Sequence, residues 1–423
     1  MLPAILLFII TYILMLIFNK SRHLIALISG ALFLITGMLP TTQFLSAIDF
    51  GVLFMMIGTM GLVSLFIESK MPLRLADIIM QKVPNVQIAV VSLALFAGII
   101  SAFVDNVATV LMIAPVGIVI CKKLKINPIP FIISIAVSSN LQGAATLVGD
   151  TTAIMLGSAT NMSFADFFLY EGKPSMFFIV ETGAVCSVLI LAFLFRKEKK
   201  AISHDMEITK VTNYIPTALL IETILLLVIT SFIPDKPDIT NGVICLVSFL
   251  CGLIFDCIKD RSANSFIPHI KNIDYQTLGL LVGLFLMIGG IKNMGVIDVA
   301  ANLLTKLGGN NMFVLYSDIL IVSVLISAFV DNIPYVATML PIISGIATQL
   351  GMDATPLYFG LLSGATLGGN LTPIGASANI VGLGILRKEG YEVETKDFLK
   401  IGIPFTLSAV IPSYILIWAF YGI

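Results

Sequence analysis

The sequence predicts an all-α polytopic membrane protein made of two inverted-topology repeats, and three observations support that prediction. First, 58% of its 423 residues are hydrophobic and only 12% are charged, whereas a soluble globular domain carries about 25% charged residues. Second, apolar runs of membrane-spanning length, about 20 residues, recur along the whole chain. Third, the hexapeptide SAFVDN occurs twice, at 101–106 and at 327–332. This composition cannot supply a water-facing shell, so we expect lipid to surround the chain.

Ten apolar runs bounded by polar breaks are expected to span the membrane. The first, LPAILLFIITYILMLIF, has no small-residue cleavage site after it, so we expect it to be a retained span and not a signal peptide. The predicted spans lie near residues 2–18, 24–39, 49–67, 128–157, 176–195, 214–233, 240–258, 277–291, 353–386 and 398–421.

Two further apolar stretches, 86–121 and 312–349, each hold SAFVDN near the middle. Each is either two full spans joined by the motif or a re-entrant hairpin whose tip lies inside the membrane. The segments before them, at 72–83 and 295–307, are predicted to be amphipathic helices at the membrane surface.

The basic residues predict how the chain is oriented. If both stretches are re-entrant hairpins and the loop after the first span is cytoplasmic, all but four of the 24 lysines and arginines lie on the cytoplasmic side. The exceptions are Lys173, Lys236, Lys292 and Lys306. This bias follows the positive-inside rule. We therefore expect both termini on the non-cytoplasmic side of what we expect to be a prokaryotic plasma membrane.

The repeated hexapeptide belongs to a longer internal repeat with a constant offset of 226 residues. That offset also matches Pro115 with Pro341, and four further pairs follow it: Leu141 and Leu367, Gly143 and Gly369, Thr146 and Thr372, Gly149 and Gly375. A weaker match pairs IDF at 48–50 with IDY at 273–275. Because the matched residues include Gly, Pro, Asp, Asn and Thr, general apolarity does not explain them.

The repeat divides the chain into three parts. Residues 1–195 form repeat 1, with its hairpin at 86–121 and a broken span at 128–157; residues 196–213 form a charged cytoplasmic linker; residues 214–423 form repeat 2, with its hairpin at 312–349 and a broken span at 353–386. Each repeat has five spans and one hairpin, so the second enters the membrane upside down. Inverted repeats are typical of secondary transporters, whose binding sites lie near the midplane at the repeat interface.

The hairpin tips place Asp105 and Asn106, and likewise Asp331 and Asn332, in apolar surroundings. One interpretation is that each aspartate only caps the returning helix, a contribution of about 1 kcal/mol. The other is that the carboxylates, with loop carbonyls, hold a coupling cation or carry a proton, because intramembrane acids face functional interiors by default. Both interpretations can hold together, and the second makes these four residues a candidate Na⁺ site.

Two polar, glycine-rich segments follow the hairpins: SSNLQGAATLVGD at 138–150 and ATLGGNLTPIGASAN at 365–379. Close packing through small residues would explain their glycines but not their polar side chains. We therefore expect broken helices whose free backbone groups bind an ion or an anionic substrate. The candidate binding residues here are Asn140, Gly143, Thr146, Asp150, Gly369, Asn370, Thr372, Ser377 and Asn379.

The repeats also differ from each other. Asp150 matches Ala376, Asn370 matches Ala144, and Asn379 matches Ala153. The third acid is present in one repeat only, so the two cation sites need not be equivalent. Asp150 is the candidate for a proton-titrating or selectivity-setting group.

These paired motifs, SAFVDNVATVLMIAP with GAATLVGD and SAFVDNIPYVATMLP with GGNLTPIGASAN, resemble the ion transporter superfamily. That group includes arsenite permeases, the melanosomal P-protein, D-type sodium/proton antiporters and divalent anion/sodium symporters. The resemblance covers nearly the whole chain. It implies two opposed re-entrant hairpins, two unwound spans around a midplane site, and elevator-like transport.

One departure from the superfamily pattern concerns the hairpin tips. Where dicarboxylate symporters carry Ser-Asn-Thr, this chain carries Asp105-Asn106-Val107 and Asp331-Asn332-Ile333. The asparagine is kept, but the hydroxyl donors are replaced by an acid and an apolar residue. This places the chain closest to the P-protein and arsenite permease branch.

The leading hypothesis is a secondary transporter that moves a small anion or oxyanion, arsenite-like or an organic acid, with Na⁺ or H⁺. A Na⁺/H⁺ antiporter is the first alternative and an ion channel the second. An enzyme is not expected, because the sequence has no HExxH motif, nucleophile elbow or nucleotide loop. We expect no cofactor besides the coupling ion and no nucleic-acid partner; the resemblance implies a homodimer.

Overall fold

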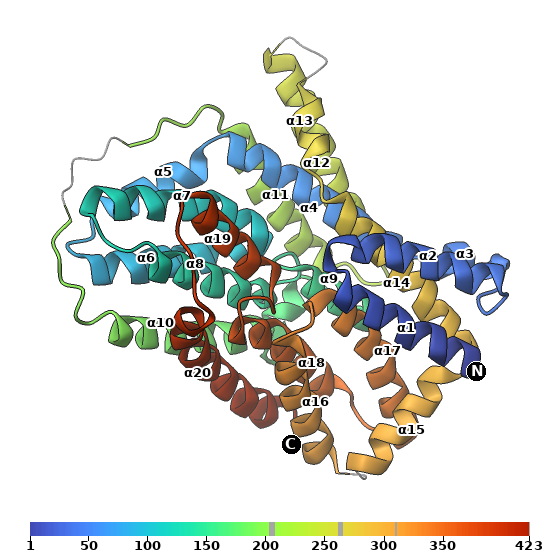
Figure 1. The fold of residues 1–423 in the computed structure, drawn as a ribbon. Coiled ribbons are helices and arrows are strands. Elements are labelled where there is room, and N and C mark those ends of the chain that lie inside the picture. Colours follow the sequence, from blue (N-terminus) through green and yellow to red (C-terminus); the bar gives the residue numbers. More distant parts are fainter. Residues whose placement is uncertain (203–207, 261–264, 309–310, 423) are drawn as a thin grey trace.

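The computed structural model describes residues 1–202, 208–260, 265–308 and 311–422 (Figure 1). The described chain is almost entirely helical, which confirms the predicted all-α polytopic class. The helices of the first half are α1 (Leu2–Ile17), α2 (Arg22–Ile35), α3 (Phe44–Ala47), α4 (Phe50–Glu68), α5 (Met71–Met80), α6 (Val86–Ser101), α7 (Asn106–Leu124), α8 (Ile129–Gln142), α9 (Thr151–Thr160) and α10 (Met176–Leu194).

The second half repeats this order of elements. Its helices are α11 (Ile215–Ser231), α12 (Thr240–Asp260), α13 (Phe266–Lys271), α14 (Tyr275–Asn293), α15 (Val296–Gly308), α16 (Met312–Ser327), α17 (Asn332–Leu350), α18 (Thr355–Gly368), α19 (Ser377–Lys388) and α20 (Thr395–Tyr421). Short 3-10 helices follow α8 (η3, Gly143–Ala145) and α18 (η5, Gly369–Leu371), as expected for broken spans. Every predicted span coincides with a helix or with one of these broken pairs.

Seven helices in the described residues are long and apolar enough to cross a membrane: α4, α7, α10, α12, α14, α17 and α20. The predicted surface segments at 72–83 and 295–307 are the helices α5 and α15. Several short elements were not predicted, among them the helices α3 and α13 and a small β-hairpin. Strand β1 (Leu169–Tyr170) pairs antiparallel with β2 (Lys173–Pro174). The turn between them needs a positive φ at two residues, 51° at Glu171 and 75° at Gly172, which glycine adopts readily.

Equivalent helices of the two halves make equivalent contacts. Helix α4 packs along α12 as α14 packs along α2, and α6 packs on α8 as α16 packs on α18. Each returning hairpin helix packs against the second half of the other repeat's broken span: α7 against α19, and α17 against α9. Helices α10 and α20 pack against each other. The pairing of neighbouring helices is therefore similar in the two halves of the chain.

Both hairpins end where the broken spans lose their helical structure. The Thr146 hydroxyl donates to the carbonyl of Ala102 at the first tip, and the Thr372 hydroxyl donates to that of Ala328 at the second. A tip that docks on the middle of a broken span favours the re-entrant hairpin over two full spans.

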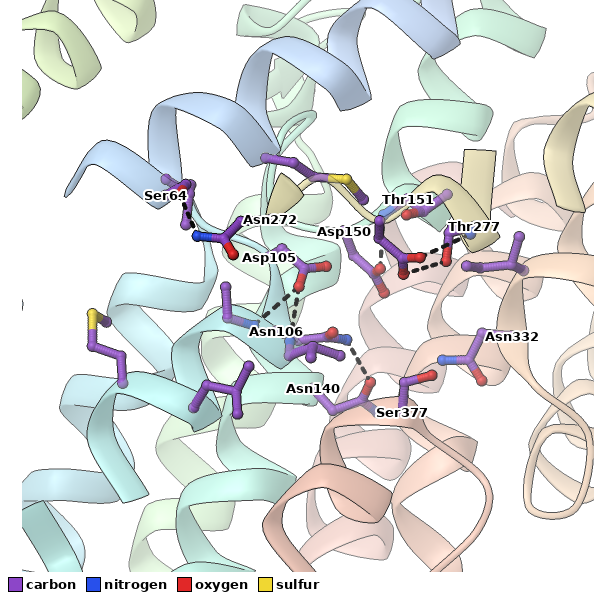
Figure 2. A pocket seen from close by; sticks show the side chains of 18 of the residues that line it. Ser64, Asp105, Asn106, Asn140, Asp150, Thr151, Asn272, Thr277, Asn332 and Ser377 are labelled. Atoms are coloured by element: carbon purple, nitrogen blue, oxygen red, sulfur yellow. Dashed lines mark hydrogen bonds between the residues drawn. The ribbon is translucent and has the colours of Figure 1, made fainter. Parts of the chain in front are cut away.

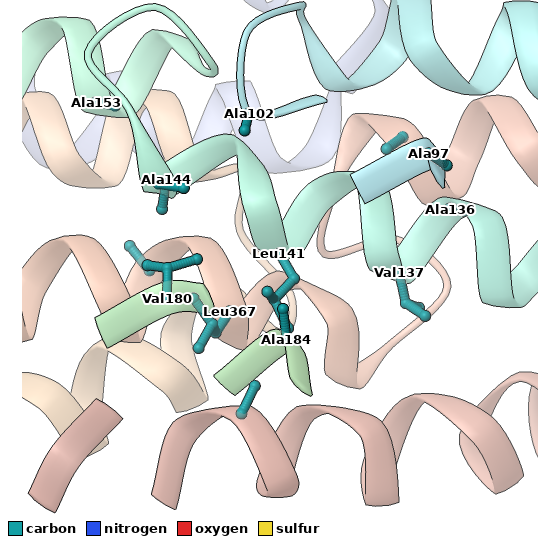
Figure 3. Packing of buried hydrophobic residues seen from close by; sticks show 14 of the residues in the cluster. Ala97, Ala102, Ala136, Val137, Leu141, Ala144, Ala153, Val180, Ala184 and Leu367 are labelled. Atoms are coloured by element: carbon teal, nitrogen blue, oxygen red, sulfur yellow. The ribbon is translucent and has the colours of Figure 1, made fainter. Parts of the chain in front are cut away.

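The helices form two groups that meet at few points. We call α1–α4, α11, α12 and α14 the framework group, and α6–α10 with α16–α20 the hairpin group. The groups pack together where α4 meets α9 and where α14 meets α17, and the surface helices α5 and α15, which belong to neither group, each contact helices of both. Small buried residues such as Ala97, Ala136, Ala144 and Ala184 let the helices inside the hairpin group approach closely (Figure 3).

Candidate functional site

A central cavity of about 410 Å³ lies where the two hairpin tips meet the framework group. Its polar lining comes from both repeats (Figure 2) and comprises Arg22, Ser64, Asp105, Asn106, Asn140, Asp150, Thr151, Asn272, Asp274, Thr277, Asp331, Asn332 and Ser377. Helices α7, α9, α14, α17 and α19 all begin at this cavity. Helix N-termini carry partial positive charge. Aspartates cap four of these five N-termini, and α19 has no side-chain cap, so its first N–H groups are donors that an anion could use.

At the first tip, Asp105 is the N-cap of α7. Its Oδ1 accepts the backbone N–H groups of Val107 (3.0 Å) and Ala108 (3.1 Å). Among the described residues, no basic side chain forms an ion pair with Asp105. The buried Asn106 donates from Nδ2 to Asn140 Oδ1 at 3.0 Å, which ties the tip to α8. The capping contact is thus present, and the carboxylate faces the cavity without a protein counter-charge (Figure 2).

At the second tip, Asp331 caps α17 through Ile333 N (3.1 Å) and also has a cationic partner. Its Oδ2 accepts from Arg22 Nη1 at 2.7 Å and from Ser377 Oγ at 3.1 Å. Asn332 Oδ1 accepts from the Ser327 hydroxyl. The sequence alone predicts Arg22 only as one of the basic residues on the cytoplasmic side. It is the first residue of α2, and its position directly before the apolar run HLIALISG was the available signal.

Asp150 is the third acid of the cavity. It caps α9 by accepting from Thr151 N at 2.7 Å, and its Oδ2 accepts from the Thr152 hydroxyl at 3.2 Å. The side chain is buried, and no described basic residue pairs with it. Asp150 is therefore either a buried carboxylate that no described basic side chain neutralises, or a carboxyl group that holds a proton.

A fourth acid, Asp274, was missed by the sequence reasoning. It caps α14, with Thr277 donating from its backbone N (3.0 Å) and its hydroxyl (2.7 Å). The match between IDF at 48–50 and IDY at 273–275 could have identified it, because the two aspartates cap equivalent helices. The cavity lining thus has four carboxylates and one guanidinium, and this excess of negative charge attracts cations.

The remaining predicted residues do not line this cavity. Asn370 joins the broken spans, accepting from Asn140 Nδ2 at 3.1 Å and donating to Val137 O at 2.8 Å. Asn379 donates to the carbonyls that the break leaves free, those of Gly369 (3.1 Å) and Thr372 (3.2 Å). Gly143, Gly369, Thr146 and Thr372 lie where the tips dock on the breaks. These residues shape the site, and seven others among the candidates line it: Asp105, Asn106, Asn140, Asp150, Asp331, Asn332 and Ser377.

A second cavity, of about 690 Å³, also lies between the framework and hairpin groups. It is lined by Asp49, Ser158 and Lys292 among others. Asp49 caps α4 through Val52 N at 3.0 Å and accepts from the hydroxyl of Ser158 on α9. Asp49 and Asp274 are thus equivalent residues of the two repeats, and each faces a different cavity. Within the described residues, no group of three or more His, Cys, Asp or Glu side chains is placed to hold a metal ion.

Comparisons with known proteins agree with the resemblance seen in the motifs. The profile of the citrate transporter family matches residues 6–364 and 266–423. An uncharacterized transporter of Mycobacterium tuberculosis (strain ATCC 25618 / H37Rv) is 29% identical over 99% of this chain and 98% of its own length. A 46 kDa membrane protein of Mycobacterium leprae is 31% identical over the same shares.

More distant similarities extend this result. The human P protein is 26% identical over 86% of this chain, which corresponds to 52% of its own length. The crystal structure of the YdaH transporter of Alcanivorax borkumensis superposes with a TM-score of 0.63 at 14% identity, over 89% of this chain and 87% of that one. That structure shares the fold with this chain. The family and fold matches confirm the predicted membership of the ion transporter superfamily.

Proposed function

The chain belongs to the citrate transporter family, and on that premise we propose a secondary active transporter that couples Na⁺ or H⁺ movement to transport of a small anion. The substrate is an organic acid of the citrate class or an oxyanion such as arsenite. Transport follows an elevator-like alternating-access mechanism. The chain is an integral membrane protein, and we propose that the linker between the repeats is cytoplasmic.

The observation that carries the proposal is the charge composition of the central cavity. Asp105, Asp150, Asp274 and Asp331 face it together with the single guanidinium of Arg22. An anion can use Arg22 and the helix N-termini, but it also meets the carboxylates. A cation bound by those carboxylates reduces this repulsion, so cation and anion each strengthen the binding of the other. That mutual dependence is the thermodynamic basis of coupling.

Within this scheme, we assign the coupling cation to Asp105 and Asn106 at the first tip. Asp331 and Asn332 form the corresponding set at the second tip, where Arg22 already supplies a positive charge. Asp150, buried beside them, is the group that takes up a proton or sets ion selectivity. The cavity volume of about 410 Å³ falls within the range of small-molecule sites, about 300–1,000 Å³.

The elevator-like mechanism is supported by how the two helix groups meet. Among the described residues, the polar links between them are few: Tyr12 to Pro334 O and to the Thr338 hydroxyl, Arg22 to Asp331, Ser158 to Asp49, and Ala165 N to Ser231. Both cavities lie along this boundary. Few polar links would have to break for the hairpin group to move against the framework group. The boundary also has one cavity beside Asp274 and another beside the equivalent Asp49, and such a movement could use both.

A Na⁺/H⁺ antiporter is the second candidate, and the excess of carboxylates favours it. Without an anion, the uncompensated acids would themselves exchange Na⁺ for H⁺. The two functions share the same site and differ in whether an anion is required for flux.

The test uses the purified protein in liposomes that are preloaded with citrate or with arsenite. Counterflow of the radiolabelled compound is measured with and without an imposed Na⁺ or pH gradient, while a trapped dye reports internal pH. We expect a cation gradient to drive accumulation of one of these anions. Sodium-dependent proton movement without any anion would establish the antiporter instead. The absence of all of these fluxes would refute the proposal.

A further inference from the structure

A buried histidine lies beside the central cavity, in the segment between the predicted spans at 240–258 and 277–291. His269 is on the short helix α13, which packs against α4 and α12. Its side chain is 1% exposed. A fully buried imidazole needs partners for both ring nitrogens, and the described residues supply them.

The two nitrogens face different chemistry. Nδ1 lies 3.1 Å from Ser64 Oγ, whereas Nε2 lies 3.2 Å from Glu68 Oε2 and 3.3 Å from Asp256 Oδ2. Glu68 on α4 and Asp256 on α12 are the charged groups in contact with the ring. The Glu68 side chain is 65% exposed and that of Asp256 is 14% exposed. One side of the imidazole thus lies beside a carboxylate that is exposed at the protein surface, at the end of α4.

The other side of the imidazole leads to the central cavity. Ser64 lines that cavity, and so does Asn272, whose Nδ2 donates to Ser64 Oγ at 3.1 Å. Figure 2 shows Ser64 and Asn272 joined at the cavity wall. Exposed Glu68, at ion-pair distance from Nε2, buried His269, whose Nε2 also hydrogen-bonds Asp256, and cavity-lining Ser64 therefore form one continuous series of polar contacts.

We propose that Glu68, His269 and Ser64 form a proton-transfer route between the solution and the central cavity. The inference rests on the proposed function and specifies H⁺ as a coupling ion that moves through this route. A proton passes from the Glu68 carboxyl to Nε2 while Nδ1 gives its proton to Ser64 Oγ. The serine hydroxyl proton passes to water or to a carboxylate in the cavity. This leaves the imidazole as its Nε2–H tautomer, and transfer of that proton from Nε2 to Nδ1 through a water molecule restores the starting tautomer. Histidine suits this task because either ring nitrogen can act as a donor or as an acceptor.

His269 could instead serve only to hold α13 in place, and the choice of variants separates the two roles. His269→Gln keeps a polar side chain but cannot carry a proton through two ring nitrogens. Tyr275→Phe is the matched control, because the Tyr275 hydroxyl donates to Ile270 O at 2.9 Å and so fixes α13 without touching the route. Glu68→Gln tests the exposed end of the route.

The experiment measures two rates in liposomes containing each purified variant. Citrate exchange at equal pH on both sides requires no net proton movement, whereas uptake driven by a pH gradient does. We expect His269→Gln to lower pH-driven uptake at least 10-fold, Glu68→Gln to lower it less, and both to keep exchange and thermal stability near those of the wild type. Tyr275→Phe should keep the pH-driven rate even where its stability falls.

Three results would overturn the inference. The first is normal pH-driven uptake in His269→Gln. The second is a loss of exchange and pH-driven uptake in parallel, with a lower melting temperature, which would indicate a structural role. The third is Na⁺-driven citrate uptake by the wild type without any proton movement, which would leave the proposed transport function intact. Failure of every coupled flux in the wild type would instead refute the proposed function itself.

Discussion

The two hairpin tips have the same six residues, SAFVDN, but different surroundings. At the second tip, Asp331 pairs with Arg22 at 2.7 Å and accepts from Ser377. At the first tip, Asp105 accepts only backbone N–H groups of its own helix among the described residues. The six tip residues are identical, so the difference comes from their surroundings. Arg22 of the framework group pairs with Asp331, and no described basic residue pairs with Asp105.

This comparison shows how an internal repeat can produce two unequal sites. A carboxylate that already has a guanidinium partner gains less from a bound cation than one that has none. Asp105 is therefore the better candidate for reversible cation or proton binding, and Asp331 for a fixed, neutralised position. The predictions below test that difference.

The largest effect is expected for Asp105→Asn. The amide keeps the size of the side chain and its capping acceptor but loses the charge, so we expect cation-driven uptake to fall at least 100-fold while the protein remains folded. The measurement is gradient-driven citrate or arsenite uptake in liposomes, with the elution profile in detergent as a check on folding. Uptake within a factor of three of the wild type would remove Asp105 from the coupling site.

A smaller effect is expected at the Arg22–Asp331 pair. Each single variant, Arg22→Gln or Asp331→Asn, leaves an unpaired charge in the cavity wall and should lower uptake about 10-fold and reduce thermal stability. The double variant should recover part of both losses, with a coupling free energy of about 0.5–3 kcal/mol in the melting analysis. Strictly additive losses would show that the ion pair does not matter for either property.

Removing the hydroxyl that docks each tip should have the same effect on stability at both tips, whereas removing the charge of Asp105 or Asp331 should not have equal effects. Thr146→Val and Thr372→Val each remove one hydroxyl that donates to a tip carbonyl, of Ala102 or of Ala328. We expect each to cost about 1–3 kcal/mol of stability, seen as similar falls in melting temperature in detergent. A large difference between the two variants would show that the repeats are not equivalent in this contact.

The smallest effect is expected for Ser377→Ala. It removes a 3.1 Å hydrogen bond to Asp331, but Arg22 remains. Uptake should change less than 3-fold, and the apparent affinity for the coupling ion should stay close to that of the wild type. A loss as large as that of Asp105→Asn would mean that Ser377 itself holds the ion or the substrate.

Local sequence patterns were enough to predict most of the fold. Apolar runs located the spans, and the offset of 226 residues located both hairpins and both breaks. The glycines explain why the breaks recur at matched places. A Cβ at Gly149 would lie 2.5 Å from Gly143 O, and one at Gly375 would lie 2.6 Å from Gly369 O. Such close backbone approach leaves room for hydrogen alone.

The candidate site was only partly predictable from the sequence. Asp105, Asp150 and Asp331 were recognised because acids are rare in apolar runs. Arg22 and His269 were not, because both lie at the edges of polar segments, where charged residues are ordinary. Their significance depends on contacts with residues more than 200 positions away, Asp331 and Ser64. Such pairings are set by helix packing, and no local pattern reports them.

Binding of the coupling ion to the purified protein at equilibrium tests the central claim most directly, because it requires no transport. The bound ²²Na⁺, or the protons taken up from a weakly buffered solution, are counted for the wild type, for Asp105→Asn and for the Arg22→Gln/Asp331→Asn double variant. We predict that Asp105→Asn loses one bound cation per chain and that the double variant loses none. Equal losses in the two variants, or no loss in Asp105→Asn, would contradict the account.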